Sequence, residues 1–388
     1  MITRDLTDRL IEAARGFPAV TLTGPRQSGK STLCRAVFPG LPYVNLEAPD
    51  IRSFATEDPR AFLARYPDGA VIDEVQRCPE LPSYLQGVID EDPRPGKWIL
   101  TGSQNLALLE SVSQSLAGRV AVLHLLPLSF PEVSRFRQHP TSLDAVLGAG
   151  GYPRIFDQRL TPSDWLGSYV ATYVERDVRT LTGIGDLSTF QRFLQLCAGR
   201  TSQLLKLSSL ASDCGITQPT AKAWLSVLET SFIAFRLKPW SGNIRKRLVK
   251  TPKLQFYDTG LVCWLLGIRT AEQLHSHPLR GPIFETWVAS EIVKHRANRG
   301  ESGGLYFFRD RHGLEADLVV EEGGTLTVIE TKSGQTVTND MLSSVRRVTS
   351  ALDEVGKIAT VVVHGGDDLQ HRSGIDVLPW SRLHERQW

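Results

Sequence analysis

The sequence predicts an α/β protein that begins with a parallel sheet built around a phosphate-binding loop. Two observations support this fold class. Short apolar runs ending in Gly, Pro or Asp alternate with helical segments through the first 130 residues, as in a parallel sheet covered by helices on both faces. The first of these runs leads into GPRQSGKS at 24–31, which has the spacing GxxxxGK(S/T). The predicted strands are 17–23, 43–46, 70–72, 98–101 and 120–126.

The composition excludes several classes of protein. The chain has 44 Lys and Arg against 42 Asp and Glu, so any nucleic-acid contact has to come from local basic patches. Its five cysteines form no CxxC pair, which leaves no readable zinc knuckle or disulfide framework. The first residues lack the apolar core of a signal peptide, and no apolar run approaches the ~18–20 residues of a membrane span. We therefore expect a cytoplasmic protein without a membrane partner.

Changes in the pattern of predicted helices and strands along the chain indicate four parts. After the alternating strands and helices, the pattern becomes helical and is interrupted by a Gly-Gly-Tyr-Pro turn at 150–153. A small helical module ending in a hairpin follows, and strands around glycine turns return after Pro252. The expected parts are a P-loop ATPase core at 1–130, a helical lid or linker at 131–185, the small module at 186–250 and an α/β domain at 251–388.

The loop at 24–31 has the chemistry of a nucleotide site. Glycines let the backbone curl so that its N–H groups converge on phosphate oxygens, assisted by the N-terminus of the following helix. We expect Lys30 to lie against the β- and γ-phosphates and the Ser31 hydroxyl to join the Mg²⁺ shell, which predicts ATP and Mg²⁺ as cofactors. The predicted nucleotide-binding residues are Gly24, Pro25, Arg26, Gln27, Ser28, Gly29, Lys30, Ser31, Thr32 and, from a later strand, Asp73.

Two later strands end in polar residues that suit the same site. The run AVIDE at 70–74 ends in two carboxylates, of which Asp73 is expected to hold Mg²⁺ and Glu74 to polarise the attacking water. The next strand closes on Gly-Ser-Gln-Asn, which would place Ser103, with Asn105 behind it, near the γ-phosphate. An ordinary Gly-Ser turn is the alternative for this second strand end.

An arginine is expected to complete the catalytic set. A planar guanidinium suits the spreading charge of phosphoryl transfer, and such arginines often come from a neighbouring subunit. Arg119, just before the last predicted strand of the core, is the first candidate, and Arg176 and Arg179 on a later helix are the others. The alternative for each is a surface or salt-bridge role.

The sequence of the middle module predicts a helix-turn-helix. Residues 207–212 form the first predicted helix, Gly-Ile-Thr the turn, and 218–228 the second helix, with Lys222 facing outward. The segment 244–253 that follows carries five positive charges and no acid, as a hairpin touching phosphates would. The predicted DNA-binding residues are Lys222, Arg245, Lys246, Arg247 and Lys250. A protein–protein spacer with a solvated basic surface is the alternative.

Three residues near the C-terminus resemble the active site of the PD-(D/E)xK nucleases. Asp317 lies on one predicted strand, and Glu330 and Lys332 lie two residues apart on the next, where they share a face. The carboxylates would bind a second Mg²⁺ and the lysine would orient water, with Glu285 on the preceding helix as an additional acid. A related fold that keeps the scaffold only for binding is the alternative.

These motifs together resemble a known family. The chain carries, in the order seen in bacterial and archaeal AAA+ ATPases whose C-terminal half is a domain of unknown function called DUF4143, the strings GPRQSGKST, YVNLEAPD, VIDEVQ, ILTGSQN, SLAGR, GGYPR, YVERDV, KLQFYDTGL and IETKSG. The resemblance covers nearly the whole chain. It implies an AAA+/ASCE P-loop parallel sheet, followed by a helical lid, a winged-helix-like module and a restriction-endonuclease-like α/β domain.

The leading functional hypothesis is an ATP-hydrolysing motor that processes structured or branched DNA by translocation, branch migration or unwinding. AAA+ sites are usually completed across subunit interfaces, so self-association into a ring is expected, with a hexamer as the default. One alternative is a nucleotide-dependent switch that acts on protein partners in a defence or regulatory system. A further alternative is a metal-dependent DNA nuclease gated by ATP.

Overall fold

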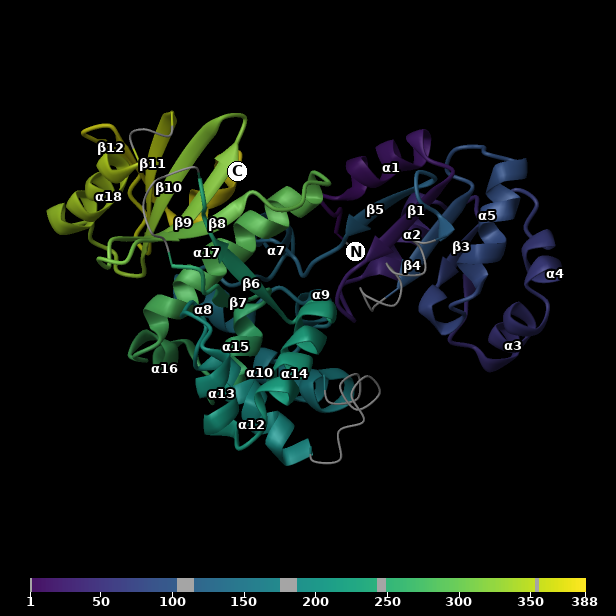
Figure 1. The fold of residues 1–388 in the computed structure, drawn as a ribbon, viewed down its shortest axis with the longest axis horizontal. Coiled ribbons are helices and arrows are strands. Elements are labelled where there is room, and N and C mark those ends of the chain that lie inside the picture. The colour runs from purple at the N-terminus through teal and green to yellow at the C-terminus, as the bar shows by residue number, and fades with distance from the viewer. Residues whose placement is uncertain (1, 103–114, 175–186, 243–248, 353–355) are drawn as a thin grey trace. The chain divides into compact units, whose positions relative to one another are not determined.

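The computed structural model describes residues 2–102, 115–174, 187–242, 249–352 and 356–388 (Figure 1). These residues divide into two compact units. The amino-terminal unit holds the chain up to Leu128 with Thr230–Phe232 and Ala297–Glu301, and the carboxy-terminal unit holds the remainder. The segments that the sequence divides at 185 and 250 thus group together in the second unit.

Five parallel strands form the sheet of the amino-terminal unit, in the order β2-β3-β4-β1-β5. All five predicted strands are confirmed, and so is their parallel arrangement. Because β4 lies between β1 and β3, the carboxyl ends of these three strands are neighbours at one edge of the sheet. The strands are β1 Ala19–Thr23, β2 Tyr43–Asn45, β3 Ala70–Asp73, β4 Trp98–Gly102 and β5 Val120–His124.

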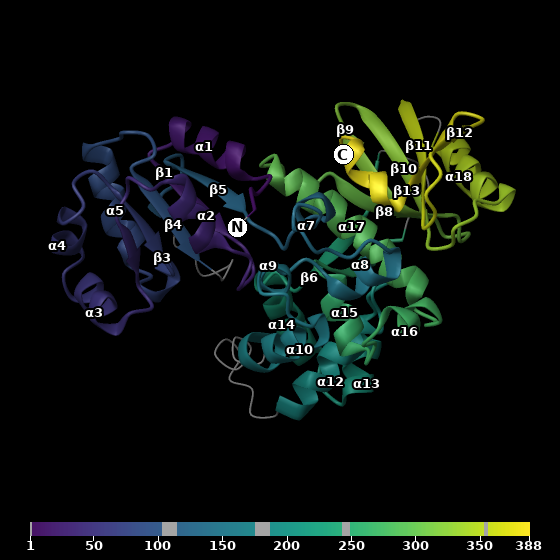
Figure 2. The same cartoon turned by 180° about the vertical axis from the view of Figure 1, so that it is seen from behind.

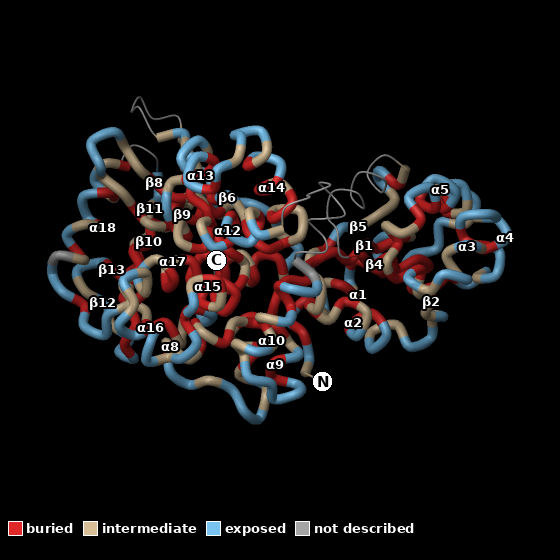
Figure 3. Tube along the Cα trace, turned by 90° about the horizontal axis from the view of Figure 1, so that it is seen from below, coloured by how far each residue is buried: buried red, intermediate tan, exposed pale blue. Residues whose placement is uncertain are grey.

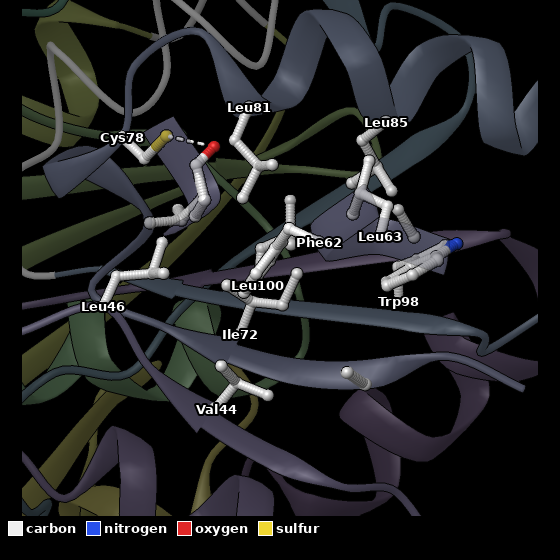
Figure 4. Close-up of a cluster of buried hydrophobic side chains, with 14 of the residues drawn as sticks. Val44, Leu46, Phe62, Leu63, Ile72, Cys78, Leu81, Leu85, Trp98 and Leu100 are labelled. Carbon is white, nitrogen blue, oxygen red and sulfur yellow. Dashed lines mark hydrogen bonds between the residues drawn. The ribbon is translucent and has the colours of Figure 1, made fainter. Parts of the chain in front are cut away.

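Helices cover both faces of this sheet, as the burial of its strands requires. Along β3, Ala70 and Ile72 enter one hydrophobic cluster, which includes α3, α4 and α5, and Val71 enters the other, which includes α1 and α2. Figure 4 shows Phe62 of α4 against Ile72 and Leu100 in the first cluster. The helices are α1 Thr7–Gly16, α2 Lys30–Val37, α3 Pro49–Glu57, α4 Pro59–Ala64, the 3₁₀ turn η1 Val75–Arg77 and α5 Leu81–Glu91.

The carboxy-terminal unit begins with helices. Gly150 ends α8 with φ +68°, which confirms the predicted turn, and a Cβ there would lie 2.3 Å from Asp258 Oδ1. Helix α10, which follows this turn, continues directly into the π-helix η2. The helices are α7 Phe130–Val133, α8 Leu143–Ala149, α9 Pro153–Asp157, α10 Pro162–Tyr169, η2 Val170–Val174, α12 Leu187–Ala198, α13 Leu207–Cys214, α14 Gln218–Thr230, α15 Thr259–Leu265, α16 Ala271–His275, α17 Arg280–Asn298, α18 Asn339–Ala351 and the 3₁₀ helix η4 Trp380–Glu385.

An eight-stranded mixed sheet, in the order β12-β13-β11-β10-β9-β8-β6-β7, runs through the carboxy-terminal unit. The hairpin β6–β7 is antiparallel, and Lys238 at the end of β6 pairs in parallel with Tyr306 of β8. The predicted hairpin of the middle module therefore belongs to the same sheet as the C-terminal strands. The strands are β6 Ala234–Pro239, β7 Lys253–Phe256, β8 Leu305–Arg309, β9 Glu315–Glu322, β10 Thr325–Lys332, β11 Lys357–His364, β12 Gln370–Arg372 and β13 Ile375–Pro379.

Helix α18 covers one face of this second sheet (Figure 2). Its residues Leu342, Val345 and Val348 join a hydrophobic cluster with Val319 and Val328 of the central strands. Figure 3 shows buried residues along the strands and exposed residues on outer helices such as α3 and α4. Among the described residues, no helix combines the length and the apolar character needed to cross a membrane.

The substitution Phe62→Ala is expected to lower the free energy of unfolding of the amino-terminal unit by about 3–5 kcal/mol, because it leaves a cavity between α4 and the sheet. Phe62 is 1% exposed. Urea unfolding followed by circular dichroism measures the change. The control Phe17→Ala, at a side chain 37% exposed, should change the same free energy by about 0.5 kcal/mol or less. Equal losses in both variants would contradict the packing described for Phe62.

Candidate nucleotide site

The loop at 24–29 joins β1 to α2 through backbone conformations that favour glycine. Gly24 has φ +150°, and a Cβ there would lie 2.1 Å from the carbonyl oxygen of Leu125. Gly29, the N-cap of α2, has φ +95°. Gln27 also lies in the left-handed region, at φ 64°. A tight left-handed turn that ends on a helix N-terminus presents backbone N–H groups to an anion, so the predicted phosphate loop has the required local structure.

Lys30 is buried at the first turn of α2. Its Nζ donates hydrogen bonds to the carbonyl oxygens of Gly24, at 3.0 Å, and Pro25, at 2.8 Å, so the ammonium spans its own loop. Burial lowers the pKa of Lys30 to about 8, although the carboxylates of Glu74 and Asp73 act in the opposite direction. The loop thus holds a cation whose acceptors, within the described part of the chain, are neutral carbonyls.

Asp73 collects hydroxyl donors from three neighbouring elements. Ser31 Oγ of α2 donates to Asp73 Oδ2 at 2.7 Å, and the Tyr43 hydroxyl of β2 donates to the same oxygen. The Thr101 hydroxyl of β4 donates to Asp73 Oδ1. These groups meet because β2, β3 and β4 are adjacent parallel strands; Thr101 lies near the carboxyl end of β4, and the Tyr43 side chain reaches Asp73 from the start of β2. A serine hydroxyl beside a carboxylate is the donor set that P-loop ATPases offer to Mg²⁺.

Glu74 follows β3 with φ 58° and ψ 40°, a left-handed conformation that is uncommon for residues other than glycine. Its backbone N–H donates to Asp73 Oδ1 at 3.0 Å. Its Oε2 accepts a hydrogen bond from Gln76 Nε2 at 2.5 Å. The backbone turn therefore separates the two carboxylates, leaving Asp73 facing Ser31 and Glu74 oriented by Gln76.

The residues present fit a nucleotide and its metal ion. Lys30 and the loop N–H groups would hold the phosphates, and Ser31 and Asp73 would hold Mg²⁺. Bound Mg²⁺ supplies charge neutralisation for the phosphoryl oxygens. Within the chain itself, Lys30 provides a cation at the loop, Asp73 orients the serine hydroxyl, and Glu74 is the carboxylate available to polarise water.

Several residues of this site belong to no sequence motif. Arg4, 8% exposed, donates from Nη1 to the Ser28 carbonyl at 2.7 Å and from Nη2 to the Leu126 carbonyl at 2.8 Å, which fastens the loop to the end of β5. Nothing in the sequence connects Arg4 to a loop twenty residues later. Thr101 and Gln76 are different, because they lie at or just after the ends of predicted strands, and a correct strand order would have placed them near Asp73. Tyr43 begins its predicted strand, and its long side chain brings the hydroxyl to Asp73.

Arg119 lies at the opposite end of the sheet from the loop. Its carbonyl accepts a hydrogen bond from the N–H of Ala19, where β1 begins, at 3.3 Å. Its Nε donates to Asp90 Oδ1 at 2.5 Å in a surface ion pair. Since β1 runs from Ala19 to the loop, Arg119 does not reach its own phosphate site, and its predicted role across a subunit interface stays a prediction. The predicted residues Ser103, Asn105, Arg176, Arg179, Arg245, Lys246 and Arg247 lie outside the described part of the chain.

The C-terminal candidate residues come together in the carboxy-terminal unit. Glu330 and Lys332 share one face of β10, and Lys332 Nζ lies 2.8 Å from Glu330 Oε1. Burial, with the charge of Asp317 on the neighbouring strand β9, raises the pKa of Glu330 to about 7. The same two causes raise the pKa of Glu285 on α17, while the neighbouring charge of Lys253 acts to lower it. Asp317 and Glu330 line a pocket of about 380 Å³ with His312 and Arg347.

The amino-terminal unit has the fold of a P-loop ATPase of the AAA type. The diagnostic features are the phosphate loop between β1 and α2, the acidic pair at the end of β3, and strand β4 inserted between β1 and β3. The chain belongs to the family of AAA-domain ATPases that carry a C-terminal DUF4143 domain. It matches the AAA domain over residues 16–134, a domain of unknown function (DUF8612) over 140–272 and DUF4143 over 280–383. DUF4143 therefore matches less than the C-terminal half expected for it.

The chain is similar to the uncharacterised proteins Mb2031c of Mycobacterium bovis and Rv2008c of Mycobacterium tuberculosis. Each is 31% identical over 367 residues, which cover 94% of this chain and 80% of the relative. Among solved structures, it is similar to a Walker-type ATPase of Pyrococcus abyssi, with 16% identity, a TM-score of 0.47 and coverage of 68% of this chain and 96% of that one. A RuvB variant of Thermotoga maritima matches with 18% identity, a TM-score of 0.30 and coverage of 61% and 90%.

Affinity for ATP is expected to fall as the pH rises above about 8. Phosphate contact favours the protonated form of Lys30, whose pKa is about 8 before nucleotide binds, so binding takes up a proton above that pH. The dissociation constant should rise by up to about tenfold per pH unit until the pKa of the complex is reached. Titration with a fluorescent ATP analogue between pH 7 and 9.5 measures it. Lys30→Ala should bind more weakly without this slope, and a flat wild-type profile would contradict the prediction.

The substitution Arg4→Ala is expected to weaken ATP binding by roughly tenfold or more, because each hydrogen bond from a charged donor contributes about 1.5–3 kcal/mol and two of them hold the loop to β5. Arg4→Lys should recover little, since one ammonium does not reproduce a two-armed guanidinium. Calorimetric titration with ATP measures the affinity. Arg15→Ala, at an exposed position in the last turn of α1, is the control and should bind normally.

Proposed function

We propose that this AAA-type ATPase is a motor that uses ATP hydrolysis to move along or remodel structured or branched DNA. The observation that carries the proposal is a helix-turn-helix, α13–α14, followed by the hairpin β6–β7 in a chain that also holds a phosphate loop and an acidic pair. Helix pairs of this kind lay their second helix in a DNA groove or along a backbone.

The helix pair has one packed side and one exposed side. The predicted boundaries agree with α13 and α14, and Gly215 joins them as the left-handed C-cap of α13, with φ 74°. Trp224 of α14 packs edge-on against Phe190 and Phe193 of α12, with ring centroids 5.3 Å apart in each pair. Lys222 lies on the exposed side of α14, where a phosphate backbone would be within reach.

The hairpin adds positive charge beside the helix pair. Strands β6 and β7 are antiparallel, and Lys250 in the connection between them is exposed. The predicted contacts Arg245, Lys246 and Arg247 belong to the same connection. A basic hairpin next to a groove-binding helix is the arrangement in which phosphate contacts set position on the duplex.

The proposed motor works as a ring of subunits, with six as the default number. In each subunit Lys30 and Ser31 bind the nucleotide, Asp73 holds its metal ion and Glu74 polarises water, while Arg119 of the adjacent subunit contacts the transferred phosphoryl group. The position of Arg119 at the edge of the sheet remote from its own loop favours such a role across an interface. DNA gripped by the carboxy-terminal unit would then move with each hydrolysis cycle.

ATP turnover is expected to rise in the presence of DNA, most with forked or four-way-junction substrates. The assay measures ATP hydrolysis with Mg²⁺, alone and with single-stranded, duplex, forked or junction DNA, and the same reactions run on a gel separate strand displacement from cleavage. Stimulation with displaced and uncut strands supports the motor. The absence of stimulation by every DNA form would favour a nucleotide switch that acts on protein partners. Cleavage lost in Asp317→Ala, with ATP turnover kept, would favour a gated nuclease.

The double substitution Lys222→Ala/Lys250→Ala tests the proposed grip in the same assay. It should raise the DNA concentration needed for half-maximal stimulation about tenfold and reduce the salt dependence of binding, because two phosphate contacts are removed. Lys357→Ala, at an exposed position on β11 of the same unit, is the matched control. An unchanged DNA requirement in the double variant would contradict the assignment of the grip to this surface.

A further inference from the structure

The pocket beside β9 and β10 resembles a nuclease site, for which the implied cofactor is a divalent metal ion. A divalent ion such as Mg²⁺ takes about six oxygen ligands from carboxylates, carbonyls and water. Among the described residues, however, no group of three His, Cys, Asp or Glu side chains is arranged to hold a metal ion. The residues at the pocket therefore do not fit the implied metal, and the cause lies in what the carboxylates contact.

Lys253 places a positive charge among these carboxylates. It is the first residue of β7 and is 2% exposed. Its Nζ lies 2.8 Å from Glu285 Oε1 and 2.7 Å from Glu315 Oε1, and 5.3 Å from the centre of the Phe307 ring. A buried ammonium bound by two carboxylates is expensive to remove, because its loss takes the ion pair from the buried Glu285 and leaves Glu315 with Arg309, whose Nη1 lies 3.0 Å from Glu315 Oε2.

The two remaining carboxylates also have donors within the chain. Asp317 Oδ2 accepts hydrogen bonds from the backbone N–H and the hydroxyl of Thr331, both at 2.8 Å. Glu330 Oε1 pairs with Lys332 Nζ at 2.8 Å. A metal ion would have to compete with these lysine ion pairs and Thr331 contacts for the carboxylate oxygens. The ammonium of Lys253 would also repel it from the Glu285 side.

We propose that Lys253 is a resident cation that takes the place of a divalent metal ion in this nuclease-like pocket. The negative charge of the carboxylate cluster is then partly balanced from within by Lys253 and Lys332, and the pocket stays closed to metal. Since Lys253 belongs to the hairpin β6–β7, the same ion pairs fasten that hairpin to α17 through Glu285 and to β9 through Glu315. This inference is independent of whether the ATPase moves on DNA.

The sequence alone does not reveal that Lys253 lies among these carboxylates, for a physical reason. Lys253 lies 64 residues before Asp317 and ends a basic segment, so the sequence alone suggests a solvent-exposed lysine that contacts phosphate. Strand β7 pairs with β6 in antiparallel fashion, and β6 pairs in parallel with β8, which brings the side chain of Lys253 to the carboxylates. Only the strand order distinguishes it from Lys250, three residues earlier, which stays exposed.

The test measures Mn²⁺ binding to the full-length protein without nucleotide, by electron paramagnetic resonance of free Mn²⁺. Lys253→Met should bind Mn²⁺ at least tenfold more tightly than the wild type, because the carboxylates lose their internal cation. The double substitution Lys253→Met/Glu330→Gln should lose the gained site, which locates it in the pocket. Lys357→Met, at an exposed position on β11, is the control and should behave as the wild type, and the ATP site contributes equally to all of these proteins.

Folded Lys253→Met that gains no Mn²⁺ affinity would overturn the proposal. A second measurement needs no lysine variant: Mn²⁺ titration of the wild type against Glu330→Gln. The proposal expects identical curves, because the pocket of the wild type takes no metal. Weaker Mn²⁺ binding in Glu330→Gln would show that the wild-type pocket is a metal site and would sink the proposal even if Lys253→Met failed to fold.

Discussion

The amino-terminal unit depends on one constraint, which is that β1, β3 and β4 are parallel neighbours ending at the same edge. This order delivers the phosphate loop, Asp73 and Thr101 to one place from three distant segments. Asp73 is the common acceptor for Ser31, Tyr43 and Thr101, so these hydrogen bonds hold α2, β2, β3 and β4 together at the candidate site. A parallel sheet tolerates such a polar edge because its apolar faces are buried by helices on both sides.

Two buried lysines show how the same side chain serves different purposes. Burial lowers the pKa of Lys30 to about 8, because its nearest acceptors are the neutral carbonyls of its loop. Burial also acts to lower the pKa of Lys253, but the charges of Glu285, Asp317 and Glu315 outweigh it and raise that pKa above its ordinary value. Lys30 therefore gains from an incoming phosphate, whereas Lys253 already has its counter-ions.

The carboxy-terminal unit joins the hairpin of the middle module and the C-terminal strands, which the sequence divides into two domains, in one sheet. The hairpin β6–β7 follows the helix pair along the chain, yet it completes the edge of a sheet whose other strands come from the C-terminal domain. Any force on the hairpin would therefore pass to this sheet through backbone hydrogen bonds and through the ion pairs of Lys253. The family boundaries, with DUF8612 ending at 272 and DUF4143 beginning at 280, divide this sheet between two domains.

The sequence by itself determined the parallel P-loop sheet, the phosphate loop, the acidic pair and the helix pair α13–α14, because each follows from local spacing: glycines that permit a left-handed turn, apolar runs of strand length, and 3.6-residue periodicity. It also brought Glu330 and Lys332 to one face, since alternate residues of a strand point the same way. Only the tertiary structure decided which residues meet across the fold. Arg4 reaches the phosphate loop and Lys253 reaches the carboxylates through strand order and long-range packing, which leave no trace in the spacing of a single sequence.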